Sequence, residues 1–171
     1  MNVKKLISIL LIVLLCFSLV GCAKTYQGYD GLIEKAREEI PISEASTTEI
    51  KIAGSIDMED GTCLVWFVTG NEYQAHYYAP IEFKQLKKND DKYEFVKIYK
   101  PLDRGDDIAV LNWKRGSAFI VNNSECVTVR ITDDNGTHEE QIGSNKYPWI
   151  FYCESIPTEY VFLDTQGNEI Q

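Results

Sequence analysis

The sequence contains two histidines, and one of them stands in a run of aromatic residues. His76 is followed by Tyr77 and Tyr78, and in a strand with alternating faces His76 and Tyr78 would share one face. There the imidazole could act as a ligand or a general base. The alternative is a solvent-facing histidine beside tyrosines of a neighbouring strand. His138 follows a turn and is expected at the surface. Neither H-x-H, HExxH nor paired Cys/His spacing occurs, which argues against a zinc site.

Three cysteines lie beyond the N-terminal segment, at positions 63, 126 and 153. Cys126 and Cys153 both lie beside predicted strands, and outside the cytoplasm they are the first pair to test for a disulfide. The alternative is that all three thiols are free and buried as small hydrophobic groups. Cys63 or Cys153 could also pair with His76 as nucleophile and base, on composition alone. No CxxC occurs, which disfavours a thioredoxin-like redox centre.

Aromatic side chains are plentiful, and Trp113 stands near the end of a predicted strand, as do Tyr147 and Trp149. Exposed rings there could form a patch for a sugar or a peptide. The alternative is that these rings pair across strands and complete the core. His76, Tyr78 and Trp113 are therefore the residues that we expect to face a ligand if the protein binds one.

Three acidic loops, residues 57–61, 103–107 and 133–136, invite a calcium interpretation. Calcium needs six or more oxygen ligands, and no loop has the full EF-hand spacing, so solvated turns explain them better. The sequence also lacks a G-x-S-x-G motif, a P-loop and a dinucleotide fingerprint. No catalytic residue, metal or cofactor is predicted.

The chain begins with two lysines and an apolar run, residues 6–20, that stops at Gly21 and Cys22. This is the outline of a secretory signal peptide. The tetrapeptide Leu19-Val20-Gly21-Cys22 resembles the lipobox of bacterial membrane lipoproteins, with a small residue before a cysteine at the end of the apolar segment. The resemblance implies a diacylglyceryl group on the Cys22 sulfur, cleavage after Gly21, and anchoring at the extracytoplasmic face of the cell membrane. The alternative is an uncleaved transmembrane helix over residues 6–23.

Three segments follow from this interpretation: a signal peptide (1–21), a tether (22–29) and one globular domain (30–171). The formal net charge is −9, and it becomes −11 without Lys4 and Lys5, which leaves 15 basic and 26 acidic side chains. Such a surface repels phosphate backbones and anionic headgroups, so we expect no nucleic-acid partner. The domain is expected to stand off the bilayer on a tether whose residues 23–29 reach ~25 Å at most.

One helix is predicted over residues 31–40, with Asp30 as its cap and Pro41 at its end. From residue 49 onward the pattern is β. Ile50, Ile52 and Ile56 alternate with polar or small residues, and residues 63–68 form an apolar run typical of a strand covered on both faces. A hairpin is predicted at residues 114–116 and a turn at residues 133–136. About nine or ten short, evenly spaced strands favour a mainly-β antiparallel sandwich or partly closed barrel with one N-terminal amphipathic helix. The alternative is an α+β fold with the helix on one antiparallel sheet.

These features together favour a lipid-anchored extracytoplasmic protein that works as a non-enzymatic binding or interaction module of the cell envelope. Its expected partners are the membrane, through the lipid on Cys22, and an envelope protein or a small ligand. Two alternatives stay open, an envelope enzyme with an unrecognised site and a structural subunit of an envelope complex. No functional family is recognised for the globular domain.

Overall fold

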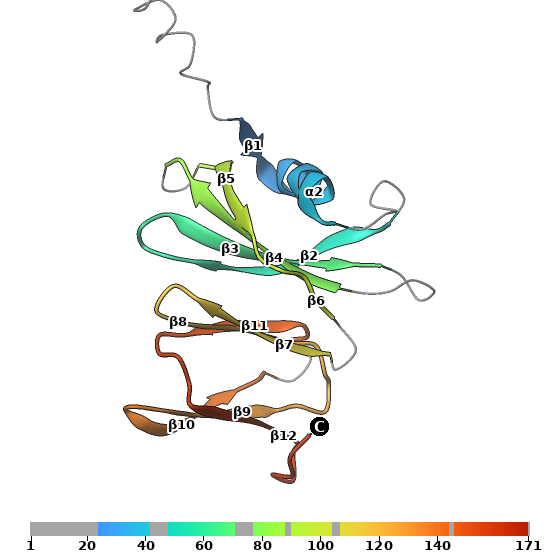
Figure 1. The fold of residues 1–171 in the computed structure, drawn as a ribbon. Coiled ribbons are helices and arrows are strands. Elements are labelled where there is room, and N and C mark those ends of the chain that lie inside the picture. The colour runs from blue at the N-terminus through green and yellow to red at the C-terminus, as the bar shows by residue number, and fades with distance from the viewer. Residues whose placement is uncertain are drawn as a thin grey trace, which may run out of the picture.

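The computed structural model describes residues 24–41, 48–70, 77–87, 90–103, 107–143 and 146–170. Within these ranges the protein is a mainly-β antiparallel sandwich with one helix, which confirms the predicted fold class. Figure 1 shows four layers stacked in the order helix α2, sheet A, sheet B and sheet C. Three hydrophobic clusters fill the three spaces between these layers.

Sheet A is the largest layer and runs in the order β1-β5-β4-β3-β2, with β6 also paired to β4. Its strands are β1 (Thr25–Gln27), β2 (Ile50–Asp57), β3 (Thr62–Thr69), β4 (Tyr77–Gln85), β5 (Lys92–Ile98) and β6 (Leu102–Asp103). The predicted apolar run of residues 63–68 is central strand β3, and it is buried on both faces as expected. One face meets α2 and the other meets sheet B.

Helix α2 (Gly28–Glu39) covers one face of sheet A through Leu32, Ala36 and Ile40. It begins before the predicted residue 31, and Asp30 lies in its first turn instead of capping it. Ile40 is extended, with φ −68° and ψ 121°. This is the conformation that a following proline imposes, so Pro41 ends the helix as predicted.

The predicted tether is shorter than expected, because residues 25–27 form β1 and the helix begins at Gly28. Strand β1 pairs with β5, and Tyr26 is buried under this pairing. Residues 25–29, which the sequence assigned to the tether, therefore belong to the domain.

A β-bulge in β2 changes which face its later residues occupy. Ile52 pairs with Phe67 and Gly54 pairs with Trp66, so Ala53 is an extra residue on β2. Because one inserted residue reverses the alternation of faces, the isoleucine pattern of the sequence splits between two clusters. Ile50 and Ile52 pack under α2, whereas Ile56 packs against sheet B. The bulge also brings the polar residues Ser55 and Asp57 to the helix-covered face.

Strand β4 is continuous from Tyr77 to Gln85. Pro80 lies within it. The Pro80 carbonyl accepts a hydrogen bond from the Tyr99 N–H. Because the nitrogen and carbonyl of one strand residue point to the same side, the Pro80 nitrogen faces the gap between the part of β4 that pairs with β5 and the part that pairs with β6. No ladder donor is needed at that break, which is why the strand tolerates a proline.

Sheet B is sandwiched between the other two sheets and consists of β7 (Ile108–Trp113), β8 (Gly116–Val121) and β11 (Trp149–Cys153), with β8 in the centre. Every residue of β8 is buried. The predicted hairpin at residues 114–116 joins β7 to β8. Alternate residues of these strands supply the cluster facing sheet A and the cluster facing sheet C.

Sheet C is the outer layer and consists of β9 (Thr128–Asp133), β10 (Gly136–Gln141) and β12 (Glu159–Leu163) in the order β10-β9-β12. The predicted turn at residues 133–136 joins β9 to β10, with Asn135 N–H donating to Asp133 Oδ1 at 2.7 Å. Gly136 takes the positive φ of 117° that a side chain would resist. Strand β10 itself was not predicted, because its residues are polar and mostly exposed.

Candidate binding site

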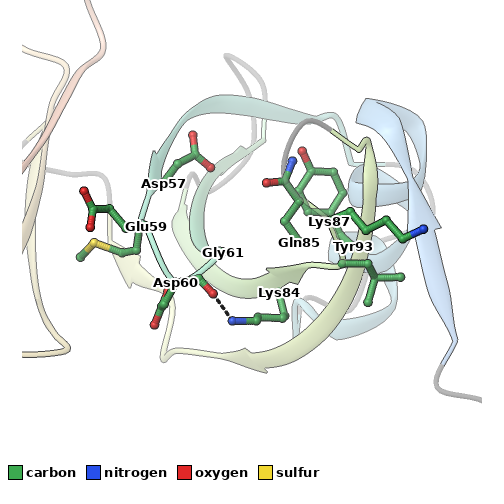
Figure 2. A pocket seen from close by; sticks show the side chains of 10 residues that line it. Asp57, Glu59, Asp60, Gly61, Lys84, Gln85, Lys87 and Tyr93 are labelled. Carbon is green, nitrogen blue, oxygen red and sulfur yellow. Dashed lines mark hydrogen bonds between the residues drawn. The ribbon is translucent and has the colours of Figure 1, made fainter.

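Two adjoining cavities lie at the end of sheet A where α2 begins, and they share Asp57 and Tyr93. The larger has a volume of about 850 Å³ and lies between the β2–β3 turn and the β4–β5 connection. Figure 2 shows the turn residues Asp57, Glu59 and Asp60 opposite Gln85, Lys87 and Tyr93. The smaller cavity, about 190 Å³, extends beneath the first turn of α2.

The wall formed by the β2–β3 turn is fixed by hydrogen bonds to Asp60. Its carboxylate accepts from the Thr62 N–H at 2.8 Å and from Lys114 Nζ at 3.0 Å. These bonds, those from Thr62 first, hold the pKa of Asp60 well below its usual range. Lys84 Nζ donates to the Asp60 carbonyl, the contact drawn as a dashed line in Figure 2. The turn is therefore held both by sheet A and by the β7–β8 hairpin of sheet B.

The smaller cavity has an apolar floor and a polar rim. Its floor is made of Leu32 from α2, Ile52 from β2, and Cys63 and Val65 from β3. Its rim carries Ser55, Asp57, Asp91, Tyr93 and, at 71% exposure, Tyr29. The β-bulge places Ser55 and Asp57 there, and the Gly28 N–H donates to the Asp91 carbonyl at 2.7 Å to fix the other side of the rim.

The wall shared by the two cavities, formed by Asp57 and Tyr93, has a negative electrostatic environment. Burial raises the pKa of the Tyr93 phenol, and the nearby Cys63, Asp57 and Asp91 raise it further. Burial likewise raises the pKa of the Cys63 thiol, with Asp57 adding to the effect. Cys63 is therefore protonated at neutral pH and is not the activated nucleophile that the sequence left open, since the thiolate is the reactive form.

The predicted ligand-facing roles of Tyr78 and Trp113 are wrong, because both side chains lie in the core between sheets A and B. Tyr78 is 0% exposed and Trp113 is 1% exposed. Tyr78 packs edge-on to Trp66, and Trp113 packs edge-on to Tyr152. For Trp113, the alternative of rings that pair across strands and complete the core is the correct interpretation. Stacking of a second sheet on sheet A buries positions that would be exposed on a single-layered sheet.

Trp113 also takes part in a polar contact between the two sheets. Its Nε1 donates to Glu82 Oε2 at 3.0 Å, and the Tyr99 hydroxyl donates to the same oxygen at 2.6 Å. Burial, and then Glu82, raise the pKa of Tyr99. These bonds connect β7 of sheet B to β4 of sheet A and give the Trp113 indole a structural partner instead of a ligand.

Two predicted residues, His76 and the lipidation residue Cys22, lie outside the described part of the chain. Cys126 and Cys153 lie in the same hydrophobic cluster, but the structure holds both as free thiols, and Cys63 likewise. The disulfide expected between Cys126 and Cys153 is not formed. Each sulfur has its own polar contact instead, Cys126 with the Thr128 carbonyl and Cys153 with the Ser155 hydroxyl.

A further cavity of about 400 Å³ between sheets B and C brings together residues that the sequence did not connect. Its wall contains His138 on β10, Asp133 at the end of β9, and Cys153 and Ser155 at the end of β11. The Ser155 hydroxyl donates to Asp133 Oδ2 and contacts Cys153 Sγ at 3.3 Å. The sequence suggested Cys153 with His76, whereas the strand order places Cys153 near His138.

No family model, curated protein or solved structure matches this chain. Among the described residues, no group of three or more His, Cys, Asp or Glu side chains is arranged to hold a metal ion. The described part of the chain also contains no helix of the length and apolar character needed to cross a membrane.

Proposed function

We propose that this chain is a lipid-anchored extracytoplasmic binding module of the cell envelope, and that the paired cavities at the start of α2 are its ligand site. The observation that carries the proposal is the smaller cavity, which combines an apolar floor with a few fixed polar groups. That combination is typical of small-molecule sites, where apolar surface supplies affinity and polar groups supply orientation.

The architecture supports a rigid site. Of its polar rim residues, Ser55 and Asp57 stand on β2 and Tyr93 on β5, while Asp91 directly precedes β5 and Tyr29 lies in the first turn of α2. Hydrogen bonds to Asp60 hold the β2–β3 turn from both sheet A and sheet B. Polar groups fixed by a scaffold lose little freedom when a ligand binds, which favours recognition.

The anchor is proposed from the resemblance of Leu19-Val20-Gly21-Cys22 to a lipobox. Because β1 begins at Thr25, a lipid on Cys22 would keep the start of α2 close to the membrane. The site would then sample ligands at the outer surface of the cell.

The anchor is tested by the intact mass of the protein from native membranes, with a Cys22→Ala variant beside it. We expect the loss of residues 1–21 and the gain of a diacylglyceryl group in the wild type only. An uncleaved, unmodified mass would contradict lipid anchoring. The ligand site is tested separately with an Ile52→Phe variant, which should fill the smaller cavity and abolish binding of any ligand that enters it.

A second candidate function, an envelope enzyme, is favoured by the group formed by Asp133, His138, Cys153 and Ser155. A thiol, a hydroxyl, a carboxylate and an imidazole in one cavity are the components of nucleophilic catalysis. Turnover of an envelope substrate that is lost in His138→Ala and in Cys153→Ala would support this function. Activity unchanged in both variants would exclude this group as its site.

A further inference from the structure

The described walls of the smaller cavity lack a compensating cation. The cavity is lined by two carboxylates, Asp57 and Asp91, and by no lysine or arginine. These carboxylates accept from neutral donors: Asp57 from Ser55 Oγ at 3.4 Å and from the Cys63 thiol, and Asp91 from Gln27 Nε2 at 3.5 Å. Both carboxylates therefore keep hydrogen-bonding capacity for a donor that enters from solvent.

We propose that the ligand of this cavity is a primary amine with an apolar body of about the size of one ring, bound with its ammonium between Asp57 and Asp91. The inference rests on the proposed binding function of the same site and adds the class of ligand. The apolar body would lie on Leu32, Ile52 and Val65, and the exposed ring of Tyr29 would lie at the entrance.

The volume of the cavity matches an apolar body of about one ring. Its volume of about 190 Å³ is somewhat larger than the ~150 Å³ apolar cavity that accommodates benzene in an engineered protein. The ammonium would be placed at the polar rim, beside the apolar body. Tyr93 lines the cavity beside both carboxylates, and their charges add to the larger effect of burial in raising the pKa of its phenol.

The first turn of α2 offers an opposing effect, because a helix N-terminus attracts anions. Its strength corresponds to roughly +0.5 elementary charge. Asp57 and Asp91 carry two full negative charges on the same rim when ionised. The carboxylates therefore outweigh the helix, and the cavity selects a cation over an anion.

Three probes of similar shape and different charge test the charge preference. Binding of 2-phenylethylamine, 2-phenylethanol and 3-phenylpropionate to the full chain, purified in detergent, would be measured by titration calorimetry at pH 7. We expect the amine to bind at least about tenfold more tightly than the alcohol, as is typical of hydrogen bonds to charged groups, and the carboxylate not to bind.

Matched variants locate the effect. Asp57→Asn and Asp91→Asn should each weaken amine binding several-fold and leave binding of the alcohol unchanged. Glu59→Gln removes the same charge from the larger cavity alone and should change neither. Thermal unfolding of each variant shows whether it is folded.

The outcomes separate the two claims. Equal affinity for the amine and the alcohol, lost in Ile52→Phe, would overturn the amine preference and leave the binding site in place. Tighter binding of the carboxylate would overturn it in favour of an anion at the helix N-terminus. No binding of any probe to a folded wild type would overturn the amine inference, whereas a ligand of another class whose binding Ile52→Phe abolishes would still support the proposed function.

Discussion

Replacing Gly116 with alanine tests the packing of sheet B, because a side chain there meets atoms that cannot move alone. A Cβ at Gly116 would lie 1.9 Å from the backbone carbonyl oxygen of Cys153 and 2.7 Å from the Tyr152 hydroxyl. Tyr152 crosses this glycine to pack edge-on to Trp113, with ring centroids 5.5 Å apart, and to donate to the Trp113 carbonyl at 3.3 Å. To fit the new methyl group, the end of β11 must move away from β8.

The expected cost follows from these contacts. Overpacking costs about 1–3 kcal/mol, loss of the aromatic pair costs about 0.5–1.5 kcal/mol, and loss of the hydrogen bond costs about 0.5–1.5 kcal/mol. Reduced freedom of the unfolded chain returns about 0.4–1 kcal/mol. Taken at the middle of each range, these effects should lower the free energy of unfolding of Gly116→Ala by about 3 kcal/mol. For a domain of this size the midpoint of thermal unfolding should fall by roughly 5–15 °C.

Gly54→Ala is the matched control, since its Cβ would also lie within 3 Å of another atom. That atom is the terminal methyl carbon Cδ1 of Ile150, at 2.7 Å, which can rotate away at a cost of about 0.5–1.5 kcal/mol. Replacing glycine with alanine also reduces the conformational freedom of the unfolded chain, which offsets part of this cost. The free energy of unfolding of Gly54→Ala should therefore stay within ~1 kcal/mol of the wild-type value. Urea unfolding of the full chain measures both variants. Equal stabilities of Gly116→Ala and Gly54→Ala would refute the reasoning.

Three further predictions follow from the polar contacts. Burial and Glu82 raise the pKa of Tyr99 in the folded state, so Tyr99 stabilises the fold at pH values below about 10, its pKa in the unfolded chain, and this stabilisation is lost as pH rises. In urea unfolding at pH 8 and pH 11, Tyr99→Phe should therefore lose less stability between the two pH values than the wild type does. An equal loss in the variant and the wild type would contradict this. Thr62 and Lys114 lower the pKa of Asp60 in the folded state. Asp60 therefore stabilises the fold at pH values above about 4, its pKa in the unfolded chain, and this stabilisation is lost as pH falls. Between pH 7 and pH 3, the free energy of unfolding should therefore decrease less in Asp60→Asn than in the wild type. Glu59→Gln, which removes the same charge, is the control. A decrease in Asp60→Asn equal to that in the wild type would contradict the prediction. Burial raises the pKa of Cys63 and Cys126. Cys153 is the most exposed of the three described thiols, at 8% against 4% for Cys63 and 0% for Cys126, so iodoacetamide at pH 8 should alkylate Cys153 before the other two. Peptide mass spectrometry measures the order, and faster labelling of Cys63 would count against the buried position assigned to it.

Local patterns in the sequence predicted much of the fold. The apolar run at residues 63–68, the turn at residues 133–136 and the stop at Pro41 all depend on neighbouring residues, and all three occur as expected. Strand β10 was missed because its polar residues have no strand signal of their own. The β9–β10 turn and the ladder to β9 form it.

The candidate site could not be found from local patterns, because it depends on a bulge and on the order of layers. Ile50, Ile52 and Ile56 read as one face, but Ala53 shifts the register and brings Asp57 to the cavity. Gly54 inside a strand was the one available signal of that bulge. Tyr78 and Trp113 were misassigned for a related reason. Their burial depends on sheet B stacking on sheet A, and strand spacing does not report such stacking.

The most direct test of the proposed site is methyl NMR of the full chain, with 2-phenylethylamine added stepwise. The account predicts that the shifted signals are those of Leu32, Ile52 and Val65, on the floor of the smaller cavity. It also predicts that Val129 and Ile131, between sheets B and C, do not shift. Shifts confined to Val129 and Ile131 would contradict the assignment of the amine site to the start of α2, and no shifts at millimolar amine would contradict the amine inference.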